Sequence, residues 1–97
     1  MGRVSYTHAA EDDLAEIWAY ISIDNEEAAD RLLRALHEQA TWLADMPEAG
    51  RYRPKLGDRI LSFPMGNYNI YYLCAQDGIE VIRVLHTARD TNRDYFS

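Results

Sequence analysis

The sequence predicts an α+β domain, in which a short N-terminal strand and an α-helical hairpin precede a three-stranded antiparallel β meander. Apolar residues recur at helical spacing between residues 8 and 46, whereas β-rich runs separated by turn residues occupy residues 59–85. With 97 residues, of which 47% are hydrophobic and 27% charged, the chain is expected to form a single domain over residues 1–97 around one packed core.

The first two elements follow directly from the N-terminal residues. Arg3 to Tyr6 has the composition of a short strand, and Thr7 is a suitable N-cap for a helix over residues 8–22. The acids of this helix, Asp13 among them, are expected mostly on its other faces. The apolar residues follow the spacing i, i+3, i+4, i+7, which predicts one buried stripe: Leu14, Ile17, Trp18 and Ile21.

A second helix is predicted immediately after the first. Asp24 and Asn25 mark the break and supply an N-cap, and acids follow in the first turn. The helix is expected to run to about Met46, because Pro47 opposes its continuation. Its apolar stripe completes a helical hairpin: Ala29, Leu32, Leu33, Leu36, Ala40 and Leu43.

The remaining half of the chain carries loop and strand signals. Residues 48–58 contain Gly and Pro and are expected to form an ordered loop. Three strands are then predicted at residues 59–64, 68–75 and 79–85, with Asp77-Gly78 as the second hairpin turn. The last of these strands is apolar on both alternating sets of positions, so it is expected to be central and covered on both faces.

The composition excludes several classes of function. Cys74 is the single cysteine, is expected to behave as a small apolar side chain in a strand, and permits no internal disulfide. The histidines are isolated and the glycines scattered, so neither a metal site nor a phosphate-binding loop is expected, and no cofactor. The chain shows no signal peptide and no apolar run of membrane-spanning length, which favours a cytoplasmic location without membrane association.

Charge is distributed unevenly along the chain. The net charge is −6, but residues 9–46 hold ten acids against two arginines, a formal charge of −8. The remaining residues hold eight basic and six acidic side chains, a formal charge of +2. Two surfaces facing different partners are one interpretation, and solvation of an acidic helix face is the other.

Arg83 and His86 are the candidate chemical groups of the last predicted strand. A charge in so apolar a strand is costly unless it is paired. Arg83 is therefore expected either to pair with Asp90 or Asp94, fixing the C-terminal segment, or to lie on a sheet face that grips phosphate or an acidic partner. His86 could transfer a proton near neutral pH or serve as a hydrogen-bonded structural residue.

Several segments, in order along nearly the whole chain, carry a resemblance to a known family. They are Ala10 to Ile21, the Asp24-Asn25 break, Ala28 to Leu32, Met46 to Arg51, Tyr71-Tyr72, Val84 to His86 and Arg89-Asp90. Together they resemble the ParE-type toxins of the ParE/RelE superfamily. The resemblance implies a strand, a helical hairpin and an antiparallel sheet, in agreement with the elements predicted above.

The resemblance also implies a function and its partners. It implies the toxin of a type II toxin-antitoxin system, which arrests growth and is bound in a hetero-oligomer by the flexible C-terminal segment of a cognate antitoxin. ParE-like toxins inhibit DNA gyrase without catalysis of their own. On this interpretation the residues expected to contact the target are Arg53, Arg59, Arg83, His86, Arg89 and Asp90.

Two alternatives remain open within the resemblance. RelE-like toxins cleave messenger RNA on the ribosome, and a metal-free ribonuclease of this kind would use Glu48, Arg83 and His86. Such ribonucleases tend to be strongly basic, whereas the net charge here is −6, which disfavours binding of a polyanion. The other alternative is a degenerate toxin that binds its antitoxin but does not arrest growth.

Overall fold

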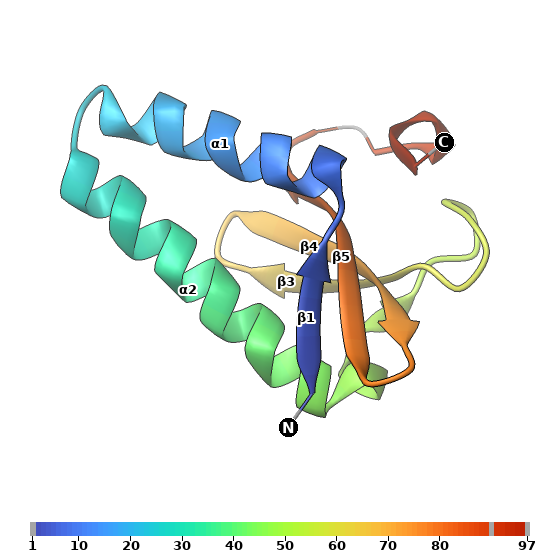
Figure 1. The fold of residues 1–97 in the computed structure, drawn as a ribbon. Helices are drawn as coiled ribbons and strands as arrows, with labels where there is room; N and C mark the ends of the chain where they lie inside the picture. The colour runs from blue at the N-terminus through green and yellow to red at the C-terminus, as the bar shows by residue number, and fades with distance from the viewer. Residues whose placement is uncertain (1, 90, 97) are drawn as a thin grey trace.

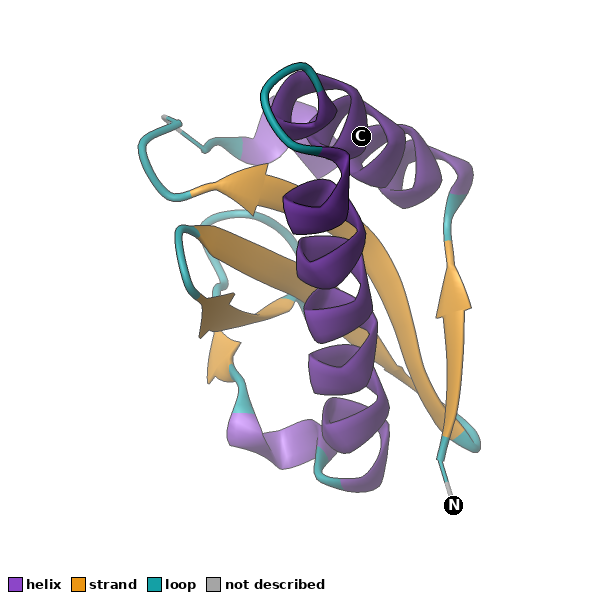
Figure 2. Ribbon diagram, turned by 90° about the vertical axis from the view of Figure 1, so that its left-hand side faces the viewer, coloured by secondary structure: helices purple, strands orange, loops and turns teal. Residues whose placement is uncertain are grey.

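Two helices pack across one face of a five-stranded sheet (Figure 1). The computed structural model describes residues 2–89 and 91–96. The helices are α1 (His8–Ser22) and α2 (Glu26–Asp45), which form the predicted hairpin. Figure 2 shows α2 running across the sheet, and we call this covered side the inner face.

The sheet contains one strand more than the sequence predicts. Its strands are β1 (Arg3–Tyr6), β2 (Arg51–Tyr52), β3 (Leu61–Met65), β4 (Tyr68–Ala75) and β5 (Gly78–His86), in the spatial order β1-β5-β4-β3-β2. The meander of β3, β4 and β5 is antiparallel, as predicted, and β1 lies parallel to β5. β5 is an interior strand between β1 and β4, and apolar clusters lie on both of its faces, as the sequence predicts.

The segment predicted as a loop differs in detail. A short 3₁₀ helix, η1 (Pro47–Ala49), follows α2, and the two residues of β2 then pair with β3. Arg59, predicted to begin a strand, instead occupies a turn with φ of 63°, because the chain must reverse before it enters β3. A second 3₁₀ helix, η2 (Arg93–Phe96), lies near the C-terminus.

Side-chain caps explain where the two helices begin. The Thr7 hydroxyl accepts a hydrogen bond from the Ala10 amide at 3.1 Å, and the Asn25 side chain accepts one from the Ala28 amide at 3.0 Å. Each cap satisfies a backbone amide that has no partner within its helix. Both helix starts therefore agree with the sequence prediction.

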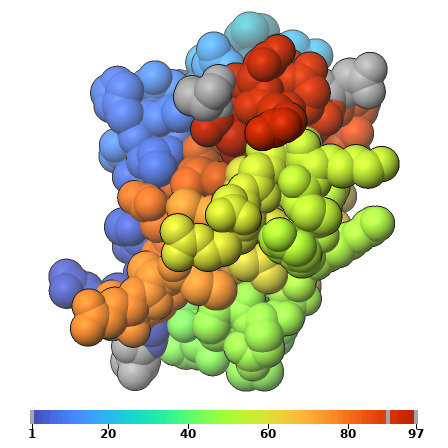
Figure 3. All heavy atoms as spheres, turned by 90° about the vertical axis from the view of Figure 1, so that its right-hand side faces the viewer, coloured from blue at the N-terminus to red at the C-terminus, as the bar shows by residue number. Residues whose placement is uncertain are grey.

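Apolar residues pack on both faces of the sheet. On the inner face, residues from the helices meet β4 and β5: Ala10, Leu36, Ala40, Leu43, Ile70, Tyr72, Ile79, Val81 and Val84. On the outer face, a smaller cluster consists of Leu56, Ile60, Tyr71 and Leu85, with Tyr95 and Phe96 packed against it. Figure 3 shows this face, where the yellow-green loop and the red C-terminal segment lie over the orange strands.

Cys74 does not behave as the sequence predicts. Its side chain is exposed, and residues 74–77 at the turn between β4 and β5 are all exposed. The strand continues past the residues that cover either face, so the strand pattern alone does not bury this position. Cys74 lies in a strand as predicted, but its exposure does not fit the expected behaviour of a small apolar side chain.

Candidate functional site

A buried ion pair joins helix α1 to the central strand β5. Arg83 Nε and Nη2 donate hydrogen bonds to the two carboxylate oxygens of Asp13, each at 2.7 Å. The side chains of Arg83 and Asp13 are only 19% and 6% exposed. Arg83 Nη1 donates to the main-chain carbonyl of Tyr95 at 2.9 Å. Every nitrogen of the guanidinium therefore has a partner within the protein.

Asp13 is a residue that the sequence analysis missed. The structure pairs Arg83 with Asp13, whereas the sequence suggests Asp90 or Asp94, and Asp90 lies outside the described residues. Asp13 was expected on another face of α1, yet it is four residues before Ile17 and shares the buried face. A carboxylate at that spacing, combined with an arginine in an apolar strand, is the signal that could have identified the pair.

A β-bulge lies in β5 beside this ion pair. Tyr71 pairs with Arg83 whereas Tyr72 pairs with Val81, so Ile82 has no partner on β4. An extra residue in one strand bends it and re-aims the neighbouring side chains. The bulge thus lies next to Arg83, whose side chain extends from β5 to α1.

Beyond the last residue of β1, side chains of other elements form hydrogen bonds with the backbone groups at this edge of β5. Asp13 Oδ2 accepts a hydrogen bond from the Val84 amide at 3.0 Å, and Thr7 Oγ1 donates one to the Ile82 carbonyl at 3.0 Å. The hydrogen bonds to Asp13 raise the pKa of Arg83 above its ordinary value, while burial opposes this rise. Arg83 is therefore charged and already neutralised by Asp13.

Two of the expected target-contacting arginines lie beside aromatic residues of the outer face. Arg53 Nη1 donates to Ser62 Oγ at 3.1 Å, and its guanidinium carbon lies 5.9 Å from the ring centroid of Tyr71. The guanidinium carbon of Arg89 lies 5.7 Å from the ring centroid of Tyr95. Both distances fit cation–π contacts. These contacts hold the two guanidinium groups at the border of the outer face.

Arg59 and His86, two other expected contact residues, lie in different elements. Arg59 is exposed in the turn before β3. His86 is exposed at the end of β5, where the Ala88 amide donates to its Nδ1 at 3.0 Å and its ring lies edge-on to Tyr68 with centroids 5.2 Å apart. Asp90 is outside the described part of the chain, so its position is not part of the site geometry.

The acid and base candidates for a ribonuclease lie beside different positions of β4. Glu48 is exposed in η1, next to Pro47, whose carbonyl accepts a hydrogen bond from the Tyr72 hydroxyl at 2.7 Å. His86 pairs with Tyr68, which precedes Tyr72 by four strand positions, roughly 13 Å. Among the described residues, no hydrogen bond or ion pair joins Glu48 to His86.

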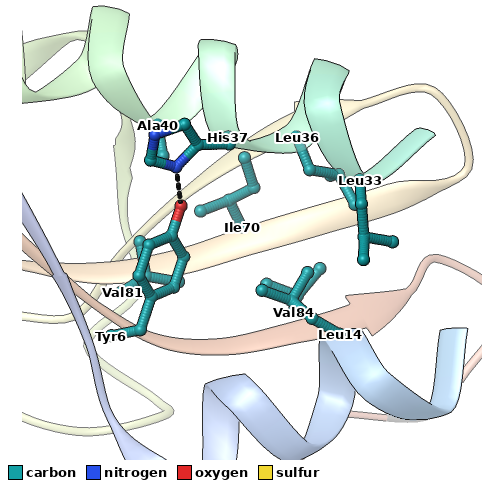
Figure 4. A pocket seen from close by; sticks show the side chains of 9 residues that line it. All are labelled: Tyr6, Leu14, Leu33, Leu36, His37, Ala40, Ile70, Val81 and Val84. Atoms are coloured by element: carbon teal, nitrogen blue, oxygen red, sulfur yellow. Dashed lines mark hydrogen bonds between the residues drawn. The ribbon is translucent and has the colours of Figure 1, made fainter. Parts of the chain in front are cut away.

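An apolar cavity of about 170 Å³ lies between the helical hairpin and the inner face of the sheet (Figure 4). Beside it, the Tyr6 hydroxyl and His37 Nδ1 lie 2.7 Å apart, and the two rings stack with centroids at 5.9 Å. Burial raises the pKa of Tyr6 to about 12, so the hydroxyl keeps its proton at neutral pH. The walls are aliphatic, which suits the apolar side chain of a partner: Leu14, Leu33, Leu36, Ala40, Ile70, Val81 and Val84.

The raised pKa of Tyr6 predicts a loss of stability at high pH. The pKa is about 12 in the folded protein and about 10 in an unfolded chain. Between these values the unfolded chain releases a proton that the folded protein keeps, so stability that is complete below pH 10 is lost as the pH rises toward 12. We expect Tyr6 to account for a decrease of about 1–2 kcal/mol in the free energy of unfolding, allowing for solvent screening.

Urea unfolding midpoints measured from neutral to strongly alkaline pH test this expectation. Tyr6→Phe removes the titrating hydroxyl and should reduce the alkaline decline. A residual decline is expected from Tyr68 and Tyr72, whose pKa values are also raised by burial. An alkaline decline of the same size in Tyr6→Phe and in the wild type would contradict the assignment.

The described residues hold neither a metal-binding group of side chains nor a membrane-spanning helix. No three His, Cys, Asp or Glu side chains within residues 2–89 and 91–96 are grouped so that they could hold a metal ion. None of the helices described combines the length and apolar character needed to cross a bilayer.

Comparisons with known proteins agree with this fold. Residues 4–91 match the model of the family described as the ParE toxin of the type II toxin-antitoxin system parDE. A protein of Caulobacter vibrioides named Toxin RelE2 is 33% identical over 89 residues, which are 92% of this chain and 99% of that relative. A solved structure described as the chromosomal ParDE TA system from P. aeruginosa has a TM-score of 0.72 at 19% identity, covering 89% of this chain and 96% of that one.

The family match extends from the first residues of β1 to beyond β5 and so includes the whole sheet and the helical hairpin. The structural likeness supports the same arrangement of strands and helices. Proteins of this family act in pairs with an antitoxin. The chain belongs to the ParE toxin family of the ParE/RelE superfamily and is the toxin component of a type II toxin-antitoxin system.

Proposed function

We propose that this toxin inhibits DNA gyrase by binding to it, without catalysis, and is neutralised by the flexible C-terminal segment of its antitoxin. The single observation that carries the proposal is the dispersal of the groups a ribonuclease would need. Glu48 lies beside Tyr72 in the middle of β4, whereas His86 pairs with Tyr68 at its first position, and the Arg83 guanidinium is already bonded to Asp13.

Cleavage of RNA without a metal makes a specific geometric demand. A base for the 2′-hydroxyl, an acid for the leaving oxygen and a cation for the charged phosphorane must all reach one phosphate. Tyr68 and Tyr72, the neighbours of His86 and Glu48, are separated by roughly 13 Å along β4. This separation does not meet the demand that both groups reach one phosphate. The buried carboxylate of Asp13 also cancels the charge that Arg83 would offer to phosphate.

Charge supports the same choice of target. A net charge of −6 opposes binding to ribosomal and messenger RNA, which depends mainly on neutralised phosphates. Binding to a protein such as gyrase does not depend on neutralising phosphates. The family resemblance described for the sequence associates ParE-like chains with gyrase, and family membership extends that expectation to this toxin.

The proposed contact surface is the border of the outer face. Arg53, Arg59 and Arg89 lie in the loop and the C-terminal segment around this face, and His86 is exposed at the end of β5. Arg83 contributes by fixing Tyr95 beneath them. Asp90 is retained in the proposed surface from the sequence alone.

One observation favours the second candidate function. The relative that is 33% identical is named Toxin RelE2, and RelE-like toxins in the resemblance are ribonucleases. For this chain, that activity would require Glu48 and His86 to act on separate parts of a substrate or to approach each other. A degenerate toxin, active only in binding its antitoxin, is the third outcome that an experiment must separate.

Purified toxin is expected to block supercoiling of plasmid DNA by gyrase and to leave messenger RNA intact in a translating extract. Glu48→Gln should inhibit gyrase as well as the wild type does, because Glu48 is outside the proposed surface. A ribonuclease would instead lose about 10²- to 10⁴-fold in rate with this substitution, since it removes a proton-transfer group. Supercoiling gels and transcript mapping measure the two activities.

Glu38→Gln provides the matched control, because it removes the same charge from an exposed position of α2. Transcripts that are cleaved by wild type and Glu38→Gln but not by Glu48→Gln, with normal supercoiling, would reject the gyrase proposal. Neither activity, together with normal growth of cells expressing the soluble protein, would identify a degenerate toxin.

A further inference from the structure

A second cavity, of about 430 Å³, lies between the later turns of α1 and the ends of β4 and β5. We call it the Glu16 cavity. Its volume falls in the range of sites that hold a small ligand or an inserted side chain. It is distinct from the apolar cavity beside Tyr6, and its walls carry aromatic and charged groups, including Glu16, Tyr20, Tyr68 and His86.

Glu16 offers an unpaired negative charge to this cavity. Among the described residues its carboxylate has no hydrogen bond or ion pair, although its charge interacts electrostatically with Arg83. Asp13, the other acid of the wall, has both oxygens bonded to Arg83. One carboxylate of the cavity is therefore free to bind a cation, and the other is not.

Aromatic rings surround the same carboxylate. Tyr20 follows Glu16 by one helical turn and lies on the same side of α1, with 78% of its surface exposed. Tyr68, from β4, is partly buried, and His86 packs edge-on against its ring with centroids 5.2 Å apart. The face of a tyrosine ring attracts a cation, so the rings and the carboxylate favour the same type of ligand.

The positive groups of the wall are engaged elsewhere. His86 Nδ1 accepts a hydrogen bond from the Ala88 amide at 3.0 Å. The guanidinium carbon of Arg89 lies 5.7 Å from the ring centroid of Tyr95, in the C-terminal segment. Neither group is paired with Glu16.

We propose that the Glu16 cavity binds an arginine side chain of the antitoxin, whose guanidinium pairs with Glu16 and stacks on a tyrosine ring. Arginine fits better than lysine, because its planar group can form two hydrogen bonds to a carboxylate and stack on a ring at the same time. The inference rests on the proposed neutralisation by an antitoxin segment and is independent of the target that the toxin inhibits.

Charge around the cavity supports a basic segment as the occupant. Residues 9–46, which include α2 and all of α1 except His8, carry ten acids and two arginines. A segment with arginine would approach a surface of opposite charge, and complementary charge speeds association and fixes register. The apolar cavity beside Tyr6 could receive a neighbouring apolar side chain of the same segment.

The test uses N-acetyl-arginine amide as the probe and the isosteric, uncharged N-acetyl-citrulline amide as its control. NMR titration of the whole toxin follows the amide resonances of Glu16, Tyr20 and Tyr68. We expect the arginine probe to shift these resonances with a Kd on the order of 1 mM and the citrulline probe to bind at least about fivefold more weakly. Saturating antitoxin should abolish the shifts, because it occupies the cavity.

Two variants make the test specific. Glu16→Gln should weaken binding of the arginine probe by about fivefold, whereas Glu11→Gln, which removes the same charge from an exposed position of α1, should change it by less than about twofold. Both sites are exposed, so folding is not at risk. Equal binding of the two probes, absence of shifts at the cavity, or shifts that persist with antitoxin bound would overturn the proposal, whether or not gyrase is inhibited.

Discussion

Replacement of Arg83 by alanine is expected to lower the free energy of unfolding by about 3–5 kcal/mol. The substitution leaves the Asp13 carboxylate, whose side chain is 6% exposed, without its charged partner in a buried site. It also removes the hydrogen bond that holds the Tyr95 carbonyl. Since a domain of this size is stable by only about 5–15 kcal/mol, the variant should unfold at a much lower urea concentration.

Arg3→Ala is the matched control for this experiment. Arg3 pairs with Asp77 at 3.7 Å, but the two side chains are 83% and 62% exposed, so its loss should cost less than about 1 kcal/mol. Asp13→Asn should resemble Arg83→Ala, because it removes the same ion pair from the other side. A wild-type urea midpoint for Arg83→Ala would show that the pair does not stabilise the fold, and any loss of toxicity would then reflect target binding.

Binding of the antitoxin is expected to stabilise the toxin by about 4 kcal/mol when the free antitoxin is 1,000 times more concentrated than its Kd. The antitoxin binds the folded toxin, so mass action displaces the unfolding equilibrium. For a domain of this size each kcal/mol raises Tm by roughly 4–8 °C. Scanning calorimetry of the toxin with and without its antitoxin measures the change.

Growth provides the corresponding cellular measurement. Expression of the toxin alone should arrest growth, and co-expression of the antitoxin should restore it. An antitoxin without its C-terminal segment is the control, and it should neither restore growth nor raise the Tm. A Tm that is unchanged by the full-length antitoxin would contradict the proposal that its flexible segment wraps the toxin.

Local patterns were sufficient to predict the helical hairpin and the meander. Thr7 and Asn25 cap helices where the sequence places them, because capping depends on neighbouring amides only. The apolar residues at both alternating sets of positions in β5 likewise predicted a strand covered on both faces, and apolar clusters lie on each side of it. These features depend on residues close together in the chain.

Features that depend on distant residues were not predictable in the same way. The hydrogen bond between Asp13 and Arg83 joins residues 70 positions apart, and helical spacing alone left Asp13 among the solvent-facing acids. The pairing of β2 with β3 involves only two residues on each strand, too few to produce an alternating pattern. The separation of Glu48 from His86 required the strand register, which the sequence does not specify.

The parallel pairing of β1 with β5 sets an order of events during synthesis. Thr7 and the carbonyl of Ile82, which share a hydrogen bond, are 75 residues apart. At about 5–20 residues per second, the ribosome needs ~4–15 s to make the chain between them. Until then β1 and the helices have no central strand to pack on, so a nascent chain holds no assembled toxin. Antitoxin already present in the cell can therefore meet each toxin molecule as it folds.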